Sequence, residues 1–347
     1  MNNNQVTMKQ IADECGVSMM TVSRALSVRH RDKLRPETRE RVLAAVKKYA
    51  FLSNPAASRL KRHKLDTITL LIGARALAVH TLNPDFDAHY EKISWGIVKD
   101  AVSTARKYGY DIKLEPILES CDEIIPHLDP RLTDGVLINS AYKHEPIIEH
   151  LQKIKMPYVI MASVETDIYK NTENHVIVDI EPGLRQAVEY LYNKGHRKIG
   201  FIGADLQTSR AFQEKIYEKL LHKKGVFNAK LFYSVHDAMG LRKLLVSFNG
   251  KFPFTALLCH NDAGADMAIK ELRYMGIDVP GKIAVIGCDY NPTYQGAGSI
   301  SLSTVELPRH DLVTQSVKLL IKTIDNESSD ISCPVTIPAR FIEGKTT

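Results

Sequence analysis

The chain has 347 residues, of which 44% are hydrophobic and 25% charged, a composition typical of a soluble globular protein with two or three domains. Its apolar runs are too short to span a membrane, and the polar start Met-Asn-Asn-Asn-Gln does not resemble a signal peptide, so we expect a cytoplasmic protein without a membrane partner. The five cysteines include no Cys-x-x-Cys pair, which argues against a structural zinc site or a disulfide framework; we expect no metal and no cofactor.

The net charge of +6 is unevenly distributed along the chain. Residues 1–64 contain six Lys and eight Arg against five acidic residues, an excess of +9, whereas the other 283 residues hold 32 basic and 35 acidic residues, a balance of −3. A small basic segment on a nearly neutral body is suited to binding phosphate backbones.

The stretch from Thr7 to Leu26 predicts two short helices joined by a tight turn. Thr7 and Gln10 have the spacing of a capping box, Gly16 supplies a left-handed residue, and Ser18 is a suitable N-cap for the second helix. That helix leaves an outward face for reading a DNA major groove, and the alternative is an ordinary helical hairpin with a solvated face. The outward residues are Met19, Met20, Thr21, Ser23 and Arg24.

A third helix is expected over Arg35 to Tyr49, because Pro36 suits the first helical position and an apolar face follows it. We expect that face to consist of Val42, Leu43, Val46 and Tyr49. The basic segment from Phe51 to Lys64 is too short to be a stable isolated helix. It is either a linker that folds on a partner or a flexible tether.

From Asp66 onward, apolar strands alternate with helices, which predicts two parallel α/β lobes in series. Strands are expected at 67–72, 111–115, 135–138, 158–161, 175–179, 198–202, 230–232, 256–259, 283–287 and 335–342. Helices are expected at 90–108, 121–128, 145–155, 181–194, 210–224, 239–248, 262–275 and 309–324. Ligands of such sheets bind beyond the carboxyl ends of the strands, so a cleft between the lobes is the expected ligand site.

The sequence resembles the lac-repressor (LacI/GalR) family of bacterial transcription regulators over essentially its whole length. The matching segments, in chain order, are 6–12, 16–18, 21–26, 36–42, Asn54 with Ala57 and Leu60, 134–138, 195–203, 261–262 and 287–289. The resemblance implies a helix-turn-helix head, a hinge helix and a two-lobed core like the type I periplasmic sugar-binding proteins. It also implies a homodimer on a near-palindromic DNA operator.

In domain terms, the resemblance implies a head at 1–50, a hinge at 51–65, a first lobe at 66–162 with 293–325, and a second lobe at 163–289 with 331–343. The three crossings between the lobes would fall near 162–165, 290–293 and 326–331. The implied DNA-binding residues are Thr7, Ser18, Met19, Met20, Thr21, Ser23, Arg24, Asn54, Ala57 and Leu60. Arg24 can donate to a guanine edge, and Leu60 would be a minor-groove wedge.

The implied effector-binding residues are Phe86, Ser140, Arg210, Gln213, Asn261, Asp262 and Asp289. Gln213 stands where the family carries a ligand-binding arginine, and Arg210 is the alternative. Polar side chains at strand ends also form hydrogen bonds with backbone groups, and this structural role is the competing interpretation for each of these residues. The resemblance predicts a repressor that senses a small molecule, either a carbohydrate or a nucleobase or nucleoside.

Two other functions are weighed against this one. A solute-binding protein of a transport system would carry a signal peptide and lack the basic head. An enzyme would carry a catalytic motif, yet the sequence has no Gly-x-Ser-x-Gly, His-Glu-x-x-His or Walker loop, so we predict a protein that is not an enzyme.

Overall fold

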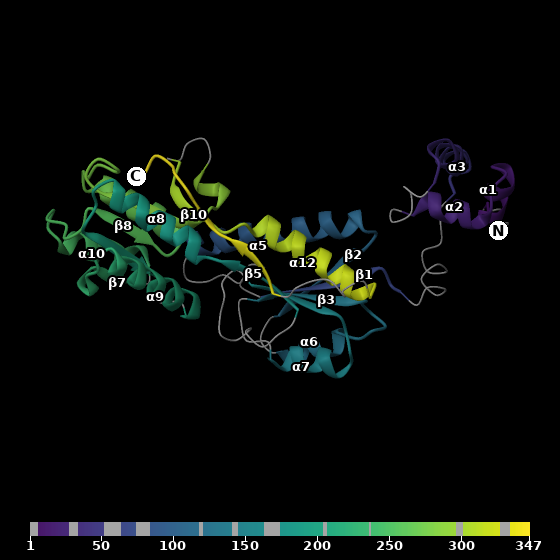
Figure 1. Ribbon diagram of the computed structural model, residues 1–347, viewed down its shortest axis with the longest axis horizontal. Coiled ribbons are helices and arrows are strands. Elements are labelled where there is room, and N and C mark those ends of the chain that lie inside the picture. Colours follow the sequence, from purple (N-terminus) through teal and green to yellow (C-terminus); the bar gives the residue numbers. More distant parts are fainter. Residues whose placement is uncertain are drawn as a thin grey trace.

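The structure is a computed structural model that describes residues 6–27, 34–51, 64–73, 84–117, 121–140, 145–162, 174–203, 207–235, 237–295, 301–326 and 334–347. It comprises a helical head and two α/β units (Figure 1). Within the described residues no helix is long and apolar enough to cross a membrane.

The head contains α1 (Met8–Glu14), α2 (Met19–Leu26) and α3 (Pro36–Lys48). Thr7 and Gln10 form the predicted capping box, and Gly16 adopts a φ of 59° at the turn. The three helices enclose a small core, which comprises Ile11, Ala12, Cys15, Val22, Ala25, Val42 and Ala45. Tyr49 was expected on the inner face but is exposed, because it lies beyond the last turn of α3, as its C-cap, while Ala45 is buried instead.

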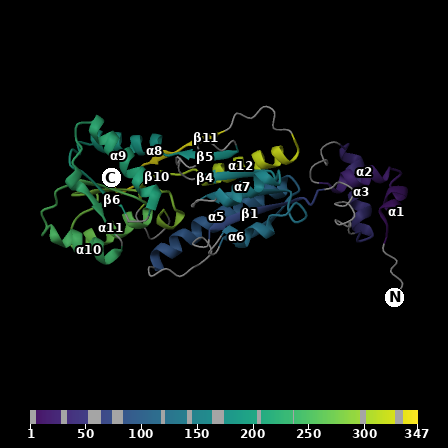
Figure 2. The same ribbon diagram turned by 90° about the horizontal axis from the view of Figure 1, so that it is seen from below.

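The first sheet is six-stranded, and all of its strand pairs are parallel. Its strands, in sheet order, are β11 (Val335–Pro338), β5 (His175–Asp179), β4 (Tyr158–Ala162), β3 (Gly135–Ser140), β1 (Thr67–Gly73) and β2 (Asp111–Ile117). Its helices are α5 (Pro84–Lys107), α6 (Cys121–Ile124), α7 (Glu145–Lys153) and α12 (Arg309–Ile324). α5 and α12 cover one face and α6 and α7 the other, which explains the continuous apolar strands (Figures 1 and 2).

The second sheet is also six-stranded and is parallel except at one edge. Its strands, in sheet order, are β12 (Arg340–Ile342), β10 (Ser303–Glu306), β9 (Ala284–Asp289), β8 (Ala256–Cys259), β6 (Ile199–Gly203) and β7 (Phe232–Ser234). Its helices are α8 (Glu181–Asn193), α9 (Gln207–Lys223), α10 (Ala238–Ser247) and α11 (Asp262–Tyr274). Buried residues of α8 and α9 pack on one face and those of α10 and α11 on the other.

The sheet order corrects the predicted crossings between the lobes. The chain leaves the first sheet after β5, returns to it between β10 and α12, and leaves it again between β11 and β12. The crossings therefore lie at 179–181, 306–309 and 338–340, and not near 162–165, 290–293 and 326–331. The boundaries 66–162 with 293–325 and 163–289 with 331–343 are wrong at β5, β10 and β11, because an apolar strand pattern does not say which sheet the strand joins.

Two further differences concern individual strands. The single final strand expected at 335–342 is divided at Ala339, so that β11 pairs parallel in the first sheet and β12 antiparallel in the second. The short strand β10 was not predicted, and it lies next to β9 in the second sheet. Both differences concern segments that border a crossing between the sheets: β10 precedes the second crossing, and Ala339 lies in the third.

The three crossings pack against one another. Ala339 donates its backbone N–H to the carbonyl of Asp179, joining the third crossing to the first. A Cβ on Gly183 would lie 2.6 Å from Val305 Cγ1 and 3.1 Å from the Ala339 carbonyl carbon, so only glycine allows this approach. The hinge between the sheets is therefore one packed cluster.

Candidate functional site

The second helix of the head exposes a face suited to the DNA groove. Ser18 caps α2, because its hydroxyl accepts the Thr21 N–H at 3.1 Å, and its Oγ also lies 3.0 Å from Thr21 Oγ1. Met19 and Met20 are 49% and 63% exposed, and Ser23 and Arg24 are exposed as well, whereas Thr21 is half-buried. The predicted reading residues of this helix thus run along α2 from its capped N-terminus to its last turn, and four of them are exposed.

The other predicted DNA residues have different positions. The Thr7 hydroxyl accepts the Gln10 N–H at 3.3 Å, and the Thr7 N–H donates to Gln10 Oε1 at 2.7 Å, so Thr7 orients α1. Asn54, Ala57 and Leu60 lie outside the described residues, as does most of the segment at 51–65.

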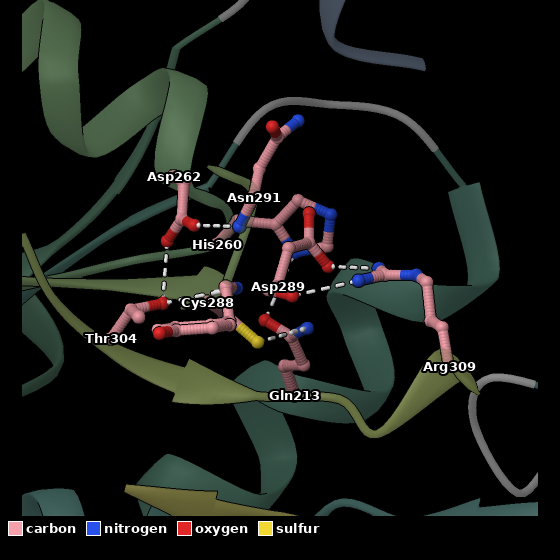
Figure 3. A network of polar contacts seen from close by, with 9 residues as sticks. Gln213, His260, Asp262, Cys288, Asp289, Asn291, Thr304 and Arg309 are labelled. Carbon is pink, nitrogen blue, oxygen red and sulfur yellow. Dashed lines mark hydrogen bonds and ion pairs between the residues drawn. The ribbon is translucent and has the colours of Figure 1, made fainter. Parts of the chain in front are cut away.

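The predicted effector residues divide between the two sheets. Ser140 is the last residue of β3, at the carboxyl end of the first sheet, while Phe86 lies in α5 and Arg210 in α9. The side chains of these three lie outside the described part of the chain. The other four, Gln213, Asn261, Asp262 and Asp289, lie at the carboxyl end of the second sheet, and Figure 3 shows Gln213, Asp262 and Asp289 there.

Asn261 and Asp262 lie at the start of α11 and are separated from the end of β8 by one residue, His260. Asn261 is buried, and its Oδ1 accepts the Gly264 N–H at 2.8 Å, so it is the N-cap of the helix. Its amide therefore has a structural use beside any contact with a ligand.

Asp262 is completely buried, and both of its carboxylate oxygens are hydrogen-bonded. Thr304 Oγ1 donates to Oδ1 at 2.5 Å, and the Asn291 N–H donates to Oδ2 at 2.7 Å (Figure 3). A Cβ on Gly287 would lie 2.3 Å from Oδ1, so glycine is needed beside this carboxyl. Asp262 therefore organises the turn after β9 from the protein interior.

Burial and, to a smaller extent, the nearby charge of Asp289 together raise the pKa of Asp262 to about 8, against the opposing effect of the Thr304 and Asn291 hydrogen bonds. This carboxyl is consequently mostly protonated at neutral pH. Among the carboxyl groups of the described residues, Asp262 has the pKa that is raised furthest above its ordinary value.

Asp289 forms an ion pair with Arg309, the first residue of α12. Arg309 Nη2 donates to Asp289 Oδ1 at 2.6 Å, and Nη1 donates to the Asp289 backbone carbonyl at 2.7 Å (Figure 3). Their side chains are only 13% and 18% exposed. The backbone here is strained, because Asp289 has a φ of 113° and Tyr290 of 54°.

Gln213 is buried on α9 and reaches the same edge. Its Oε1 lies 3.0 Å from His260 Nδ1, and its Nε2 donates to Cys288 Sγ at 3.8 Å. Gln213 thus orients the half-buried imidazole of His260, which lies between the end of β8 and Asn261.

Sequence reasoning missed four members of this cluster: His260, Asn291, Thr304 and Arg309. His260 had a usable signal, since it stands between β8 and Asn261 at a carboxyl strand end. Thr304 and Arg309 had none, because their partners lie 42 and 20 residues away and are brought near only by the pairing of β9 with β10. Within the described residues, no group of three or more His, Cys, Asp or Glu could hold a metal ion.

These features define a sensor core joined to a helix-turn-helix head. Residues 7–54 match the family described as bacterial regulatory proteins, lacI family, and residues 188–347 match a periplasmic binding protein-like domain. The match at 7–54 identifies the head as that of the lacI family of bacterial regulatory proteins, and head and core together make the chain a DNA-binding transcription regulator.

Curated relatives match over nearly the full length. The chain is 27% identical to the catabolite control protein A of Priestia megaterium, over 97% of each chain. It is also 27% identical to the transcriptional regulator RegA of Clostridium saccharobutylicum, over 93% of this chain and 94% of the relative. The transcriptional repressor CytR of Escherichia coli K12 is 26% identical over 92% and 90%.

Solved structures share the fold. A lac repressor dimer bound to operator and the anti-inducer ONPF has a TM-score of 0.70 and 22% identity, over 99% of each chain. A complex of the transcriptional regulator CelR with cellobiose has a TM-score of 0.67 and 22% identity, over 99% of this chain and all of that one.

Proposed function

We propose that the protein is a dimeric repressor that binds a near-palindromic operator, and that a small molecule lowers or raises its affinity for this operator. The observation that carries this proposal is the exposed face of α2, on which Met20, Ser23 and Arg24 are all exposed to solvent. Contacts from such a helix to base edges specify sequence, while the basic head supplies phosphate contacts. The proposed site of action is cytoplasmic, and no catalytic role is proposed.

We further propose that the effector binds at the carboxyl edge of the second sheet and faces the first lobe. Gln213, His260, Asn261 and Asp289 gather there amide, imidazole and carboxylate groups, which suit the hydroxyl groups of a sugar. CelR was solved with cellobiose, which supports a carbohydrate. A nucleobase or nucleoside is the other class to test.

Operator binding can be tested with the full-length protein and duplexes that it selects from a random pool. Tight binding to one near-palindromic sequence is expected, with an affinity that falls steeply as salt rises. Arg24→Ala should weaken binding to the selected site at least tenfold, equivalent to about 1.4 kcal/mol. The matched control is Arg106→Ala, which removes the same charge from an exposed position on α5. Selection of no common sequence, or equal effects of the two variants, would overturn the proposal.

The effector site can be tested by thermal unfolding in the presence of neutral sugars, sugar phosphates and nucleosides, because a ligand that binds only the folded state raises Tm. A hit should lose its shift in Asn261→Asp, which retains the Oδ1 acceptor that caps α11. Asn228→Asp is the control, since Asn228 Oδ1 likewise accepts the Lys230 N–H but lies elsewhere. A shift that survives Asn261→Asp combined with Gln213→Glu would place the ligand outside this edge.

A further inference from the structure

The pair Arg309–Asp289 spans the second crossing between the lobes. β10 runs beside β9 in the second sheet until Glu306 pairs with Asp289, and the chain then bends into α12. α12 packs on β3, β4 and β5 of the first sheet. The side chain of Arg309, at the start of that helix, turns back to Asp289 in the second sheet (Figure 3). A rotation of α12 relative to β9 would therefore separate the two groups.

The geometry points to a latch at this hinge: we propose that Arg309 is the positioning residue that fixes the orientation of the two lobes through Asp289. This inference deepens the proposed function, because it names the contact through which occupancy of the effector site would act on the first lobe. The guanidinium donates to both the carboxylate and the backbone carbonyl of one residue. Such a fork constrains direction as well as distance.

The backbone held by this fork is strained at two successive residues. Positive φ values at Asp289 and Tyr290 persist only where the surroundings hold them, and two groups do so here. Arg309 holds Asp289 from the first-lobe side, and Asp262 accepts the Asn291 N–H from the second-lobe side. The turn at 289–291 therefore has one restraint that would be lost when the lobes rotate and one that would be retained.

A second ion pair at the hinge provides a matched control. Arg340 donates to Glu306 between the third and second crossings, but the Arg340 side chain is 69% exposed. Exposed ion pairs contribute little to stability. A buried ion pair that loses one partner leaves an unpaired buried charge, which destabilises the fold. The two arginines thus occupy neighbouring crossings, but Arg340 is more exposed and pairs within the second sheet, whereas Arg309 donates through two nitrogens from α12 to β9.

The test is amide hydrogen exchange of the full-length protein without DNA or effector, so its result is independent of the proposed function. In Arg309→Gln, peptides covering 286–295 and all three crossings, at 179–184, 303–312 and 335–342, should exchange at least about tenfold faster. Peptides from the sheet interiors, at 156–162 and 256–259, should keep the wild-type rate. Arg340→Gln should change the crossings by less than about threefold.

Two further variants separate a latch from a general loss of stability. Arg309→Lys keeps the charge but not the fork and should give intermediate exchange, and it also serves if Arg309→Gln is insoluble. The double variant Asp289→Asn with Arg309→Gln should exchange no faster than Arg309→Gln alone, because the two substitutions break the same ion pair. Faster exchange in the 286–295 turn alone, equal acceleration everywhere, or equal effects of Arg309→Gln and Arg340→Gln would overturn the latch.

Discussion

The Thr304 hydroxyl donates a hydrogen bond to the buried carboxyl of Asp262 at 2.5 Å, which joins β10 to the start of α11. The same carboxyl accepts the Asn291 N–H, so one side chain holds three segments of the second lobe together. Its buried environment opposes ionisation of this carboxyl, so the stability of the protein should depend on pH.

The stability of the protein should fall as the pH rises through the range set by Asp262. Its pKa is raised to about 8 in the folded protein, above the ordinary value of about 3.9, so the folded state holds the proton more tightly. The stability that Asp262 contributes is fully present below about pH 4 and is lost as the pH rises through about 8. The free energy of unfolding should fall by no more than about 1.4 kcal/mol per pH unit from this one group. Asp262→Asn cannot ionise and should flatten this decline, as measured by urea unfolding from pH 5 to 9. An unchanged slope would show that Asp262 is not the group responsible.

Gly183 should not tolerate a side chain. In Gly183→Val the new Cβ would meet Val305 and the backbone of Ala339 at the hinge, and overpacking of this kind costs about 1–3 kcal/mol. Gly96→Ala, in α5, is the control, because a Cβ there has no atom within 4 Å and alanine favours a helix. Thermal unfolding should show a lower Tm for the first variant and an unchanged or higher Tm for the second. The reverse order would contradict the packing of the crossings.

Removal of the Ser18 cap should loosen the recognition helix. Ser18→Ala leaves the Thr21 N–H without its acceptor and should cost about 1 kcal/mol of head stability. Ser23→Ala, at an exposed position inside the same helix, should change stability by less than about 0.5 kcal/mol. Amide exchange of α2 in the full-length protein measures both. Equal protection in the two variants would mean that the cap has no energetic role.

Tyr217→Phe should leave the protein as stable as before or make it more stable. The Tyr217 hydroxyl is fully buried and has no hydrogen-bond partner among the described residues, and burial raises its pKa well above the ordinary value. Removing an unsatisfied polar atom relieves its desolvation cost. Tyr158→Phe is the matched control, because Tyr158 Oη accepts the Gln152 amide at 3.1 Å. Calorimetry should give a lower Tm for the control alone, and a loss of about 1 kcal/mol or more in Tyr217→Phe would reveal an additional partner.

The head is the part of the molecule that local sequence determines most completely. The capping residues Thr7 and Ser18, the left-handed Gly16 and the apolar spacing act within a few residues, and the structure contains the helices they predict. The alternation of strands and helices in the core was likewise visible in the sequence. The 309–324 helix has the predicted bounds, because its periodicity and its surroundings agree.

The assembly of the lobes was decided by tertiary structure. β5 could have joined either sheet on its apolar pattern, and only its pairing with β4 and β11 places it in the first. Similarly, the sequence predicts Asp289 and Asp262 at an effector site but does not indicate their partners within the protein. The fold buries Asp262 under Thr304 and pairs Asp289 with Arg309. Local periodicity specifies which residues face inward, but the partner of a buried charge depends on strand pairings between distant segments, and these exist only in the folded chain.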